Sequence, residues 1–252
     1  MYSYDTRVGY SFCGPDGSAS IPAVINLMQD CSTFQSEELG IGLKELMEAG
    51  RAWLLSSWQV VFDRMPVENE KIKVSTYAYR FKGFYGYRNF TITDSNENVC
   101  AYANSIWFYF DINAGKPVKA EPLNGKTYPV DDPFPMETAP RKIVFPGDFN
   151  EIAMCAESFK VNYSALDTNG HVNNCEYIRY AIDSLPSDLL KNFNIKQLRV
   201  DYKNAAHLGD VITPRVAYKE DSKKIFIKLS DPEGLELAGA ELSEAPYTEE
   251  KG

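Results

Sequence analysis

The stretch VNYSALDTNGHVNN, residues 161–174, decides the fold because a related stretch, VGYSFCGPDGSASI, stands at residues 8–21. The two stretches are offset by 153 residues, and at that offset Gly17 matches Gly170. Each is followed by apolar residues at three- and four-residue steps, the pattern of an amphipathic helix. Self-similarity at a fixed offset, together with a repeated order of elements, predicts an internal duplication.

The sequence pattern of the first half of the chain predicts a strand, a helix and four further strands. Ser20 can cap the helix, and Pro22 suits its first turn. The four strands are rich in β-branched and aromatic residues and are separated by turn-forming residues. They are expected at residues 53–62, 71–80, 87–93 and 99–110.

The same order of elements returns in the second half, with a helix that starts at Asn173. Its expected strands cover residues 158–163, 195–202, 211–218, 224–229 and 235–242. Between the halves, seven of the 14 prolines fall between residues 111 and 150, which is the composition of a linker. We therefore expect a first repeat at residues 1–115, a linker at 116–149, a second repeat at 150–245 and a tail at 246–252.

Composition excludes several classes of protein. The 252 residues are 44% hydrophobic and carry a net charge of −9, which disfavours nucleic acid and anionic membrane as partners. No stretch approaches the roughly 18 apolar residues of a membrane span. The five cysteines are odd in number and form no CxxC pair, so neither a disulfide framework nor a metal site is predicted. The N-terminus resembles no signal or transit peptide, so we expect a cytoplasmic protein.

One polar cluster distinguishes the two halves. Asp167, Asn169, His171 and Asn173 stand at alternate positions before the second helix, whereas the first half has glycine and serine where Asp167 and His171 stand. A requirement of the helix entry should appear twice, so the asymmetry favours catalysis. Histidine transfers protons near neutral pH, and free N–H groups at the helix start could hold an oxyanion. The alternative is a turn of Asp, Asn and Gly with Asn173 or Asn174 as a helix cap.

Five segments resemble the acyl-acyl-carrier-protein thioesterases, the family of plant fatty-acyl thioesterases and their bacterial relatives. They are WQVVFDRMP (58–66), GYR (86–88), SIW (105–107), DTNGHVNN (167–174) and DYKN (201–204). The resemblance implies an α+β fold, a tandem double hotdog in which each repeat is a long helix wrapped by an antiparallel β-sheet. It also implies hydrolysis of the thioester of fatty acyl-acyl carrier protein, releasing free fatty acid. Without a plastid-type leader, the chain resembles a bacterial member.

The resemblance also implies roles for individual residues. Asp167, Asn169 and His171 are expected to be catalytic. The first repeat is expected to bind the acyl chain, with Met28 and Trp53 among its walls, and Asn173 is expected to contact substrate. No cofactor and no metal are expected.

The resemblance names acyl carrier protein as the partner, and a homodimer is left open. Docking of this acidic partner is expected at a local patch of basic residues. Arg88, Arg179 and Lys203 are candidates because they lie near the matched segments.

One family position departs from the pattern. The family has a Glu three residues after the Tyr of the last matched segment, where this chain has Ala205, and the next position, a Cys in plant members, is Ala206. Three interpretations stay open: His171 acts unaided, His207 or a carboxylate substitutes, or the activity is attenuated. Competing functions are a coenzyme A thioesterase or hydroxyacyl dehydratase of hotdog fold, and a non-catalytic acyl-binding module. Cys175 as a nucleophile is the weaker alternative to packing.

Overall fold

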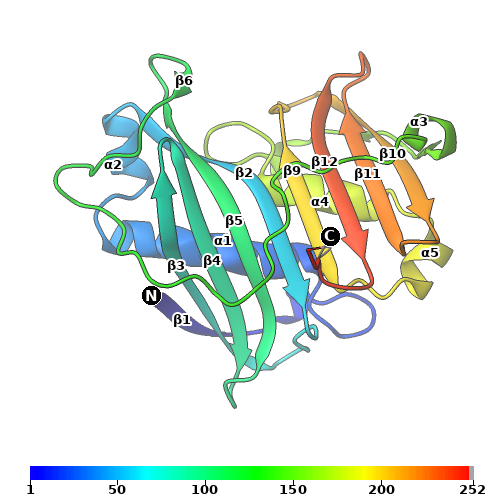
Figure 1. Cartoon of the computed structure of the whole chain (residues 1–252), viewed down its shortest axis with the longest axis horizontal. Coiled ribbons are helices and arrows are strands. Elements are labelled where there is room, and N and C mark those ends of the chain that lie inside the picture. The colour runs from blue at the N-terminus through cyan, green and yellow to red at the C-terminus, as the bar shows by residue number, and fades with distance from the viewer. Residues whose placement is uncertain (250–252) are drawn as a thin grey trace. The chain divides into compact units, whose positions relative to one another are not determined.

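The computed structural model describes residues 1–249 and divides the chain into two compact units. The first unit comprises Met1–Ser56 and Val60–Glu137, and the second comprises Ser57–Gln59 and the chain from Thr138 onward. Figure 1 labels most of the elements of both. Each is a mixed α+β unit built on an antiparallel sheet.

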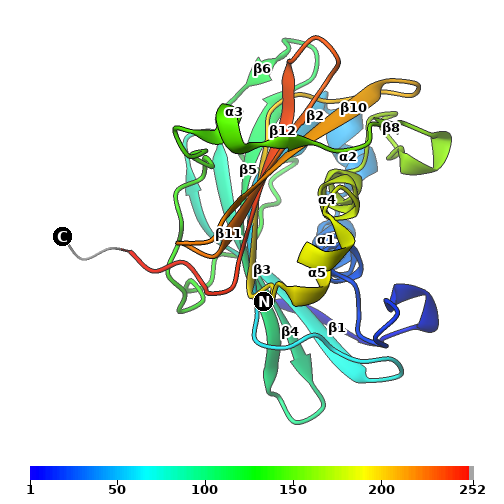
Figure 2. The same cartoon turned by 90° about the vertical axis from the view of Figure 1, so that its right-hand side faces the viewer.

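The sheet of the first unit has the strand order β1-β3-β4-β5-β2. The pairs β1–β3, β3–β4 and β4–β5 are antiparallel, and the short β6 pairs with the end of β5. Helix α1 lies along one face of this sheet (Figure 2). The elements are β1 (Tyr2–Arg7), α1 (Ile21–Glu38), α2 (Leu43–Glu48), β2 (Arg51–Phe62), β3 (Lys71–Lys82), β4 (Tyr85–Asp94), β5 (Val99–Asp111) and β6 (Lys116–Pro117).

Helix α1 begins where the sequence places it. The Ser20 hydroxyl accepts a hydrogen bond from the Ala23 amide at 3.3 Å, and Pro22 lies in the first turn. The apolar residues Val24 and Met28 are fully buried against the sheet. Burial of this face, more than helix propensity, stabilises an 18-residue helix in water.

The sheet of the second unit has the order β9-β12-β11-β10-β7, and β8 also pairs with β10. Helix α4 lies against one face of this sheet, as α1 does in the first unit (Figure 2). The elements are α3 (Phe149–Ile152), β7 (Met154–Cys155), β8 (Phe159–Lys160), α4 (Asn174–Asp183), α5 (Ser187–Asn192), β9 (Gln197–Tyr202), β10 (Val211–Lys219), β11 (Lys224–Ser230) and β12 (Glu236–Ser243).

The strand expected at residues 158–163 is mostly wrong. Only Phe159–Lys160 pairs, and Tyr163–Ala165 forms a 3₁₀ turn instead. The reason is that this part of the chain contacts β10 through two separate two-residue pairings, β7 and β8. The other long strands differ from expectation by at most two residues at either end.

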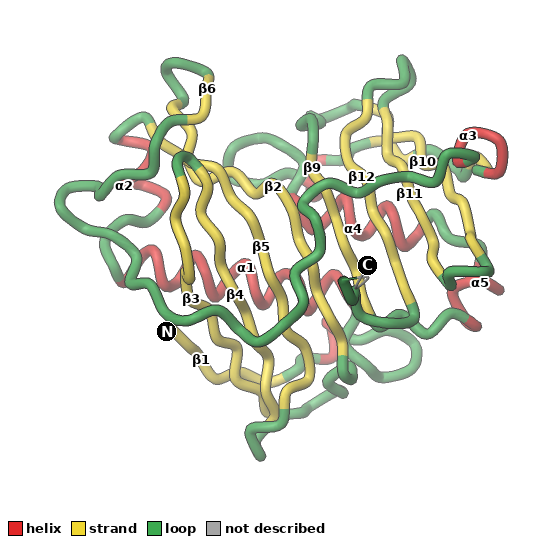
Figure 3. Tube along the Cα trace, in the orientation of Figure 1, coloured by secondary structure: helices red, strands yellow, loops and turns green. Residues whose placement is uncertain are grey.

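The proline-rich segment is irregular, as Figure 3 shows by its colour, and each of its two parts packs within its own unit. Tyr128 is 7% exposed, and its hydroxyl lies 2.8 Å from that of Ser36 on α1. Further along, Ile143 packs with Phe149 and Phe226 in the core of the second unit. The boundary between the units falls inside this segment, between Glu137 and Thr138. Of the expected tail, residues 250–252 lie outside the described part of the chain.

The duplicated stretches have the same backbone geometry. Gly17 and Gly170 both adopt a φ of +76°, and each donates its amide hydrogen to the carbonyl three residues earlier, at 3.0 and 3.1 Å. Both stretches contain a 3₁₀ turn and end at a capping residue, Ser20 for α1 and Asn173 for α4. The differences between them are therefore differences of side chain.

Candidate active site

The loop that carries the predicted catalytic residues is held by Asp167. One oxygen of this carboxylate, Oδ1, accepts hydrogen bonds from the backbone amides of Asn169 at 2.8 Å and His171 at 3.1 Å. The Asp167 amide in turn donates to the His171 carbonyl at 2.7 Å. Asn169 and His171 are exposed on this closed turn. Asp167 therefore fixes the backbone from which both side chains project.

A second loop, between β9 and β10, lies beside the first and is fixed to α4 by Tyr177. The Tyr177 hydroxyl accepts a hydrogen bond from the Ala206 amide at 2.8 Å, and the Ala206 carbonyl accepts one from the Val172 amide at 2.9 Å. Burial raises the pKa of Tyr177 to about 12, and the negative charges of Asp210 and Asp167 add to this rise. Carboxylates from both loops therefore act on one buried hydroxyl.

The two loops bring the chain's only two histidines together. His171 and His207 form an antiparallel backbone bridge, and their ring centroids are 5.1 Å apart with planes inclined at 75°. The Nδ1 atom of His207 lies 3.8 Å from Oδ2 of Asp210, and that oxygen also accepts the His207 amide at 2.8 Å. The His207 side chain is 60% exposed, as expected for a loop residue. The sequence left open that His207 substitutes for the missing Glu, and the structure adds its contact with His171.

The start of α4 is capped by Asn173, one of the two residues proposed as a cap. The Asn173 side chain accepts a hydrogen bond from the Cys175 amide at 2.9 Å, so that N–H group is already satisfied. Cys175 itself is 1% exposed on the packed face of the helix. Its burial fits packing and not a reactive thiol.

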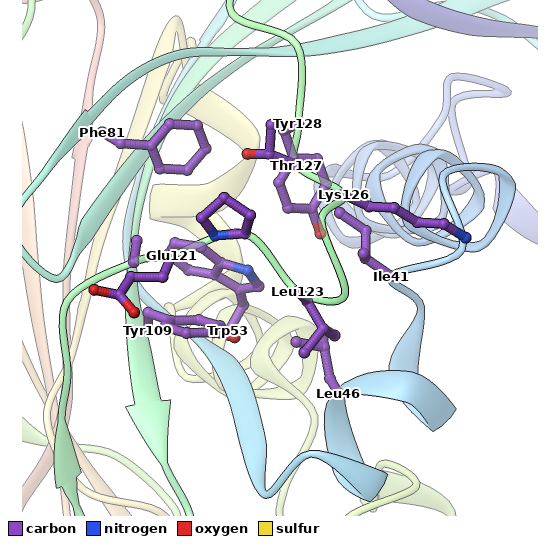
Figure 4. Close-up of a pocket in the computed structure, with 12 residues that line it drawn as sticks. Ile41, Leu46, Trp53, Phe81, Tyr109, Glu121, Leu123, Lys126, Thr127 and Tyr128 are labelled. Carbon is purple, nitrogen blue, oxygen red and sulfur yellow. The ribbon is translucent and has the colours of Figure 1, made fainter.

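Of the residues expected to hold the acyl chain, Trp53 lines a cavity of about 120 Å³ in the first unit. Figure 4 shows its indole beside Tyr109, and the ring centroids are 4.8 Å apart. Leu123 and Tyr128, from the proline-rich segment, close the other side. Small-molecule pockets usually measure about 300–1,000 Å³, so this cavity in its present form holds only part of an acyl chain. Met28 is fully buried on α1.

The proposal that Arg88 docks an acidic partner is wrong. Arg88 is only 7% exposed, because its guanidinium donates hydrogen bonds to Gln35 and Thr76 and stacks on the ring of Tyr128. Lys203 pairs with Glu236 at 2.8 Å and Arg179 with Glu176 at 3.2 Å. These two lie at the surface of the second unit, each beside a carboxylate that offsets its charge.

Within residues 1–249, no group of three or more His, Cys, Asp or Glu side chains could hold a metal ion. No helix in the same range is long and apolar enough to cross a membrane.

Comparison with known proteins decides the family. Residues 1–123 match the acyl-ACP thioesterase N-terminal domain, and residues 151–243 match the acyl-ACP thioesterase C-terminal domain. The chain belongs to the acyl-ACP thioesterase family. Among curated members of this family, a chloroplastic palmitoyl-acyl carrier protein thioesterase of Gossypium hirsutum is 25% identical over 211 residues, which are 79% of this chain and 50% of that protein. The chain spans about half the length of the curated relatives it matches.

Solved structures of acyl-ACP thioesterases share the fold. One from Bacteroides thetaiotaomicron superimposes with a TM-score of 0.84 at 22% identity and covers 96% of both chains. The 12:0-ACP thioesterase from Umbellularia californica gives a TM-score of 0.81 at 16% identity, covering 98% of this chain and 97% of the other. At these identities the likeness concerns the fold alone.

Proposed function

We propose that the chain hydrolyses the thioester of fatty acyl-acyl carrier protein and releases a free fatty acid. The observation that carries this proposal is the loop of the second unit, where Asp167 fixes the turn and His171 is exposed beside a second histidine. Family membership over both halves of the chain supports it. Asp167, Asn169 and His171 are the proposed catalytic residues.

The two units then have different tasks. We propose that they are two hotdog repeats, each a helix embraced by an antiparallel sheet, with acyl-chain binding in the first and catalysis in the second. The cavity beside Trp53 supports acyl binding by the first unit. Met28 is fully buried on α1 and is not among the residues that line this cavity, so its contact with the acyl chain stays a prediction. The polar cap residue Asn173 stands next to the catalytic loop and is proposed to contact substrate. Location in a cytoplasm and a possible homodimer stay predictions.

The chemistry requires water at the thioester carbonyl. Imidazole transfers protons at neutral pH and contributes about 10²–10⁴-fold as a general acid or base. A fixed loop keeps its side chains aligned, which matters because misplacement by about 1 Å can cost about 100-fold. Asp167 supplies this rigidity through its two backbone hydrogen bonds.

The test is hydrolysis of a panel of acyl-acyl carrier protein and acyl-coenzyme A substrates by the parent, His171→Ser and Ser18→Ala. Ser18 occupies the position of His171 in the first unit, so His171→Ser introduces a residue that this backbone already accepts. We expect His171→Ser to lose most activity without loss of melting temperature, and Ser18→Ala to match the parent. Preference for coenzyme A substrates would show a coenzyme A thioesterase instead. Acyl binding without turnover would show a non-catalytic acyl-binding module.

Salt dependence distinguishes the partner. A chain of net charge −9 must attract an acidic carrier through a local basic patch, and such contacts are screened with a Debye length of ~8 Å at physiological salt. Turnover of the carrier-bound substrate should therefore fall between low and about 0.5 M salt, because salt screens the encounter. Turnover of a short neutral thioester should stay constant, and an equal response of both substrates would argue against docking by charge.

A further inference from the structure

Ala205 stands where the family has a Glu, so this position supplies no group that could accept a proton. Two residues further on, His207 carries an imidazole that could. We propose that His207 removes the proton from the attacking water, and that Asp210 positions the His207 ring. This inference rests on the proposed thioester hydrolysis. It adds a catalytic residue and a positioning residue outside the loop that carries His171.

The geometry fits this assignment. The ring of His207 lies against that of His171, and its Nδ1 faces Oδ2 of Asp210 at 3.8 Å, which leaves Nε2 free for a water. The backbone bridge between the two histidines fixes the positions of the two main-chain segments that carry the rings. On the other side, the Tyr177 hydroxyl holds the segment through the Ala206 amide. An exposed imidazole on a fixed backbone can meet both substrate and water.

The first unit shows that the fold itself does not need this histidine. There the bridge equivalent to His171–His207 joins Ser18 to Val67. The carboxylate of Glu70 accepts the Val67 amide at 2.8 Å, just as Asp210 accepts the His207 amide at 2.8 Å. An acidic residue that accepts the amide three residues earlier therefore stabilises this turn in both units, as Glu70 in the first and Asp210 in the second. The two histidines are what only the second unit adds.

The step balances with the groups present. The water oxygen bonds to the thioester carbonyl carbon while His207 takes one water proton, leaving a tetrahedral oxyanion. Collapse of that intermediate breaks the carbon–sulfur bond, and the imidazolium returns the proton to the departing thiolate. The products are a free acid and a thiol, and neither oxidant nor reductant is needed. His171, beside the reacting centre, is then free to donate a ring N–H group to the carbonyl oxygen.

The first arm of the experiment compares the parent with His207→Val and Leu208→Ala on two substrates, an acyl-acyl carrier protein and the matching acyl-N-acetylcysteamine thioester. Val is the residue that the first unit carries at this position, so His207→Val should keep the parent's melting temperature. We expect kcat to fall about 10²–10⁴-fold on both substrates with little change in KM. Leu208→Ala, an exposed neighbour outside the site, should behave as the parent.

The second arm tests Asp210 as a positioning residue. Asp210→Asn keeps a side-chain oxygen that can accept the His207 amide, but it removes the negative charge. Because the His207 and Asp210 side chains are both exposed, we expect kcat to fall about fivefold or less. Asp210→Glu, which introduces the acid found in the first unit, should restore kcat. In the His207→Val background, Asp210→Asn should cause no further loss, because the group it positions is absent.

Each outcome decides a separate question. Parental kcat in His207→Val overturns the inference, and so does a gain of about 100-fold or more in Ala205→Glu, which would show that the parent lacks a base. Turnover of the small thioester without turnover of the carrier substrate overturns the proposed function, while the His207 comparison still stands. A parent inactive on both substrates overturns both.

Discussion

Substituting alanine for Gly170, and separately for Gly17, would test whether the duplicated loops share a structure but not a function. Both glycines have a φ of +76°, where an L residue is strained, and no atom lies within 4 Å of the position a Cβ would take. Steric clash therefore adds nothing, and the cost is that of the left-handed backbone, about 1–2 kcal/mol for each substitution. For a chain of this size that cost lowers the melting temperature by about 2–8 °C.

Activity should separate the two variants. Gly170 lies between Asn169 and His171, so relaxation of the strained turn moves both side chains, and a shift of about 1 Å can lower kcat about 100-fold. Gly17 lies in the loop with Ser18 at the histidine position and should change stability alone. The assay is thermal unfolding together with single-temperature kinetics on an acyl thioester. Equal kinetic losses in the two variants, or parental kcat in Gly170→Ala, would refute the reasoning.

Three further predictions concern the first unit. Trp53→Ala should enlarge the 120 Å³ cavity and move the substrate preference toward longer acyl chains, measured with a chain-length series. Tyr128→Ala should lower the free energy of unfolding by about 3 kcal/mol, measured in urea, because it empties a packed site. Val130 lies in the same segment but is 57% exposed, so the control variant Val130→Ala should change the free energy of unfolding by less than about 0.5 kcal/mol. Asp94, whose hydrogen bonds to Asn98 and Arg64 lower its pKa to about 2, should stabilise the unit above about pH 4 and lose this effect as pH falls toward 2. Asp94→Asn should therefore flatten the acid limb of the stability curve.

Local signals predicted much of each unit. The strand expected at residues 53–62 was recognisable because five of its ten residues are β-branched or aromatic, and α1 because Ser20 and Pro22 mark its start. The helices α2 and α5 were missed because six residues are too few to show a helical period. The apparent strand at 158–163 failed because pairing partners, and not composition, decide where a strand forms.

Only the part of the site that lies in one continuous motif could be predicted from the sequence, because contacts between separate loops depend on how the chain pairs. Asp167, Asn169 and His171 lie in one short motif, whereas the contact of His207 with His171 depends on how two loops bridge. The sequence did contain a signal, because the turn at Val67 precedes an acid as the turn at His207 does. Burial of Arg88 had no such signal, since its partners Gln35 and Thr76 are distant in the chain and uncharged.

A duplicated scaffold allows function to be separated from fold without any mutation. In both units the same amide and carbonyl groups bond around the helix entry, so these bonds are explained by folding alone. What folding does not explain is the pair of replacements, serine by His171 and valine by His207, at two positions that face each other across a backbone bridge. A single exposed histidine in a turn needs no functional reason. Two that meet, where the matching bridge of the first unit has none, are better explained by a reaction that needs two imidazoles than by the needs of the turn.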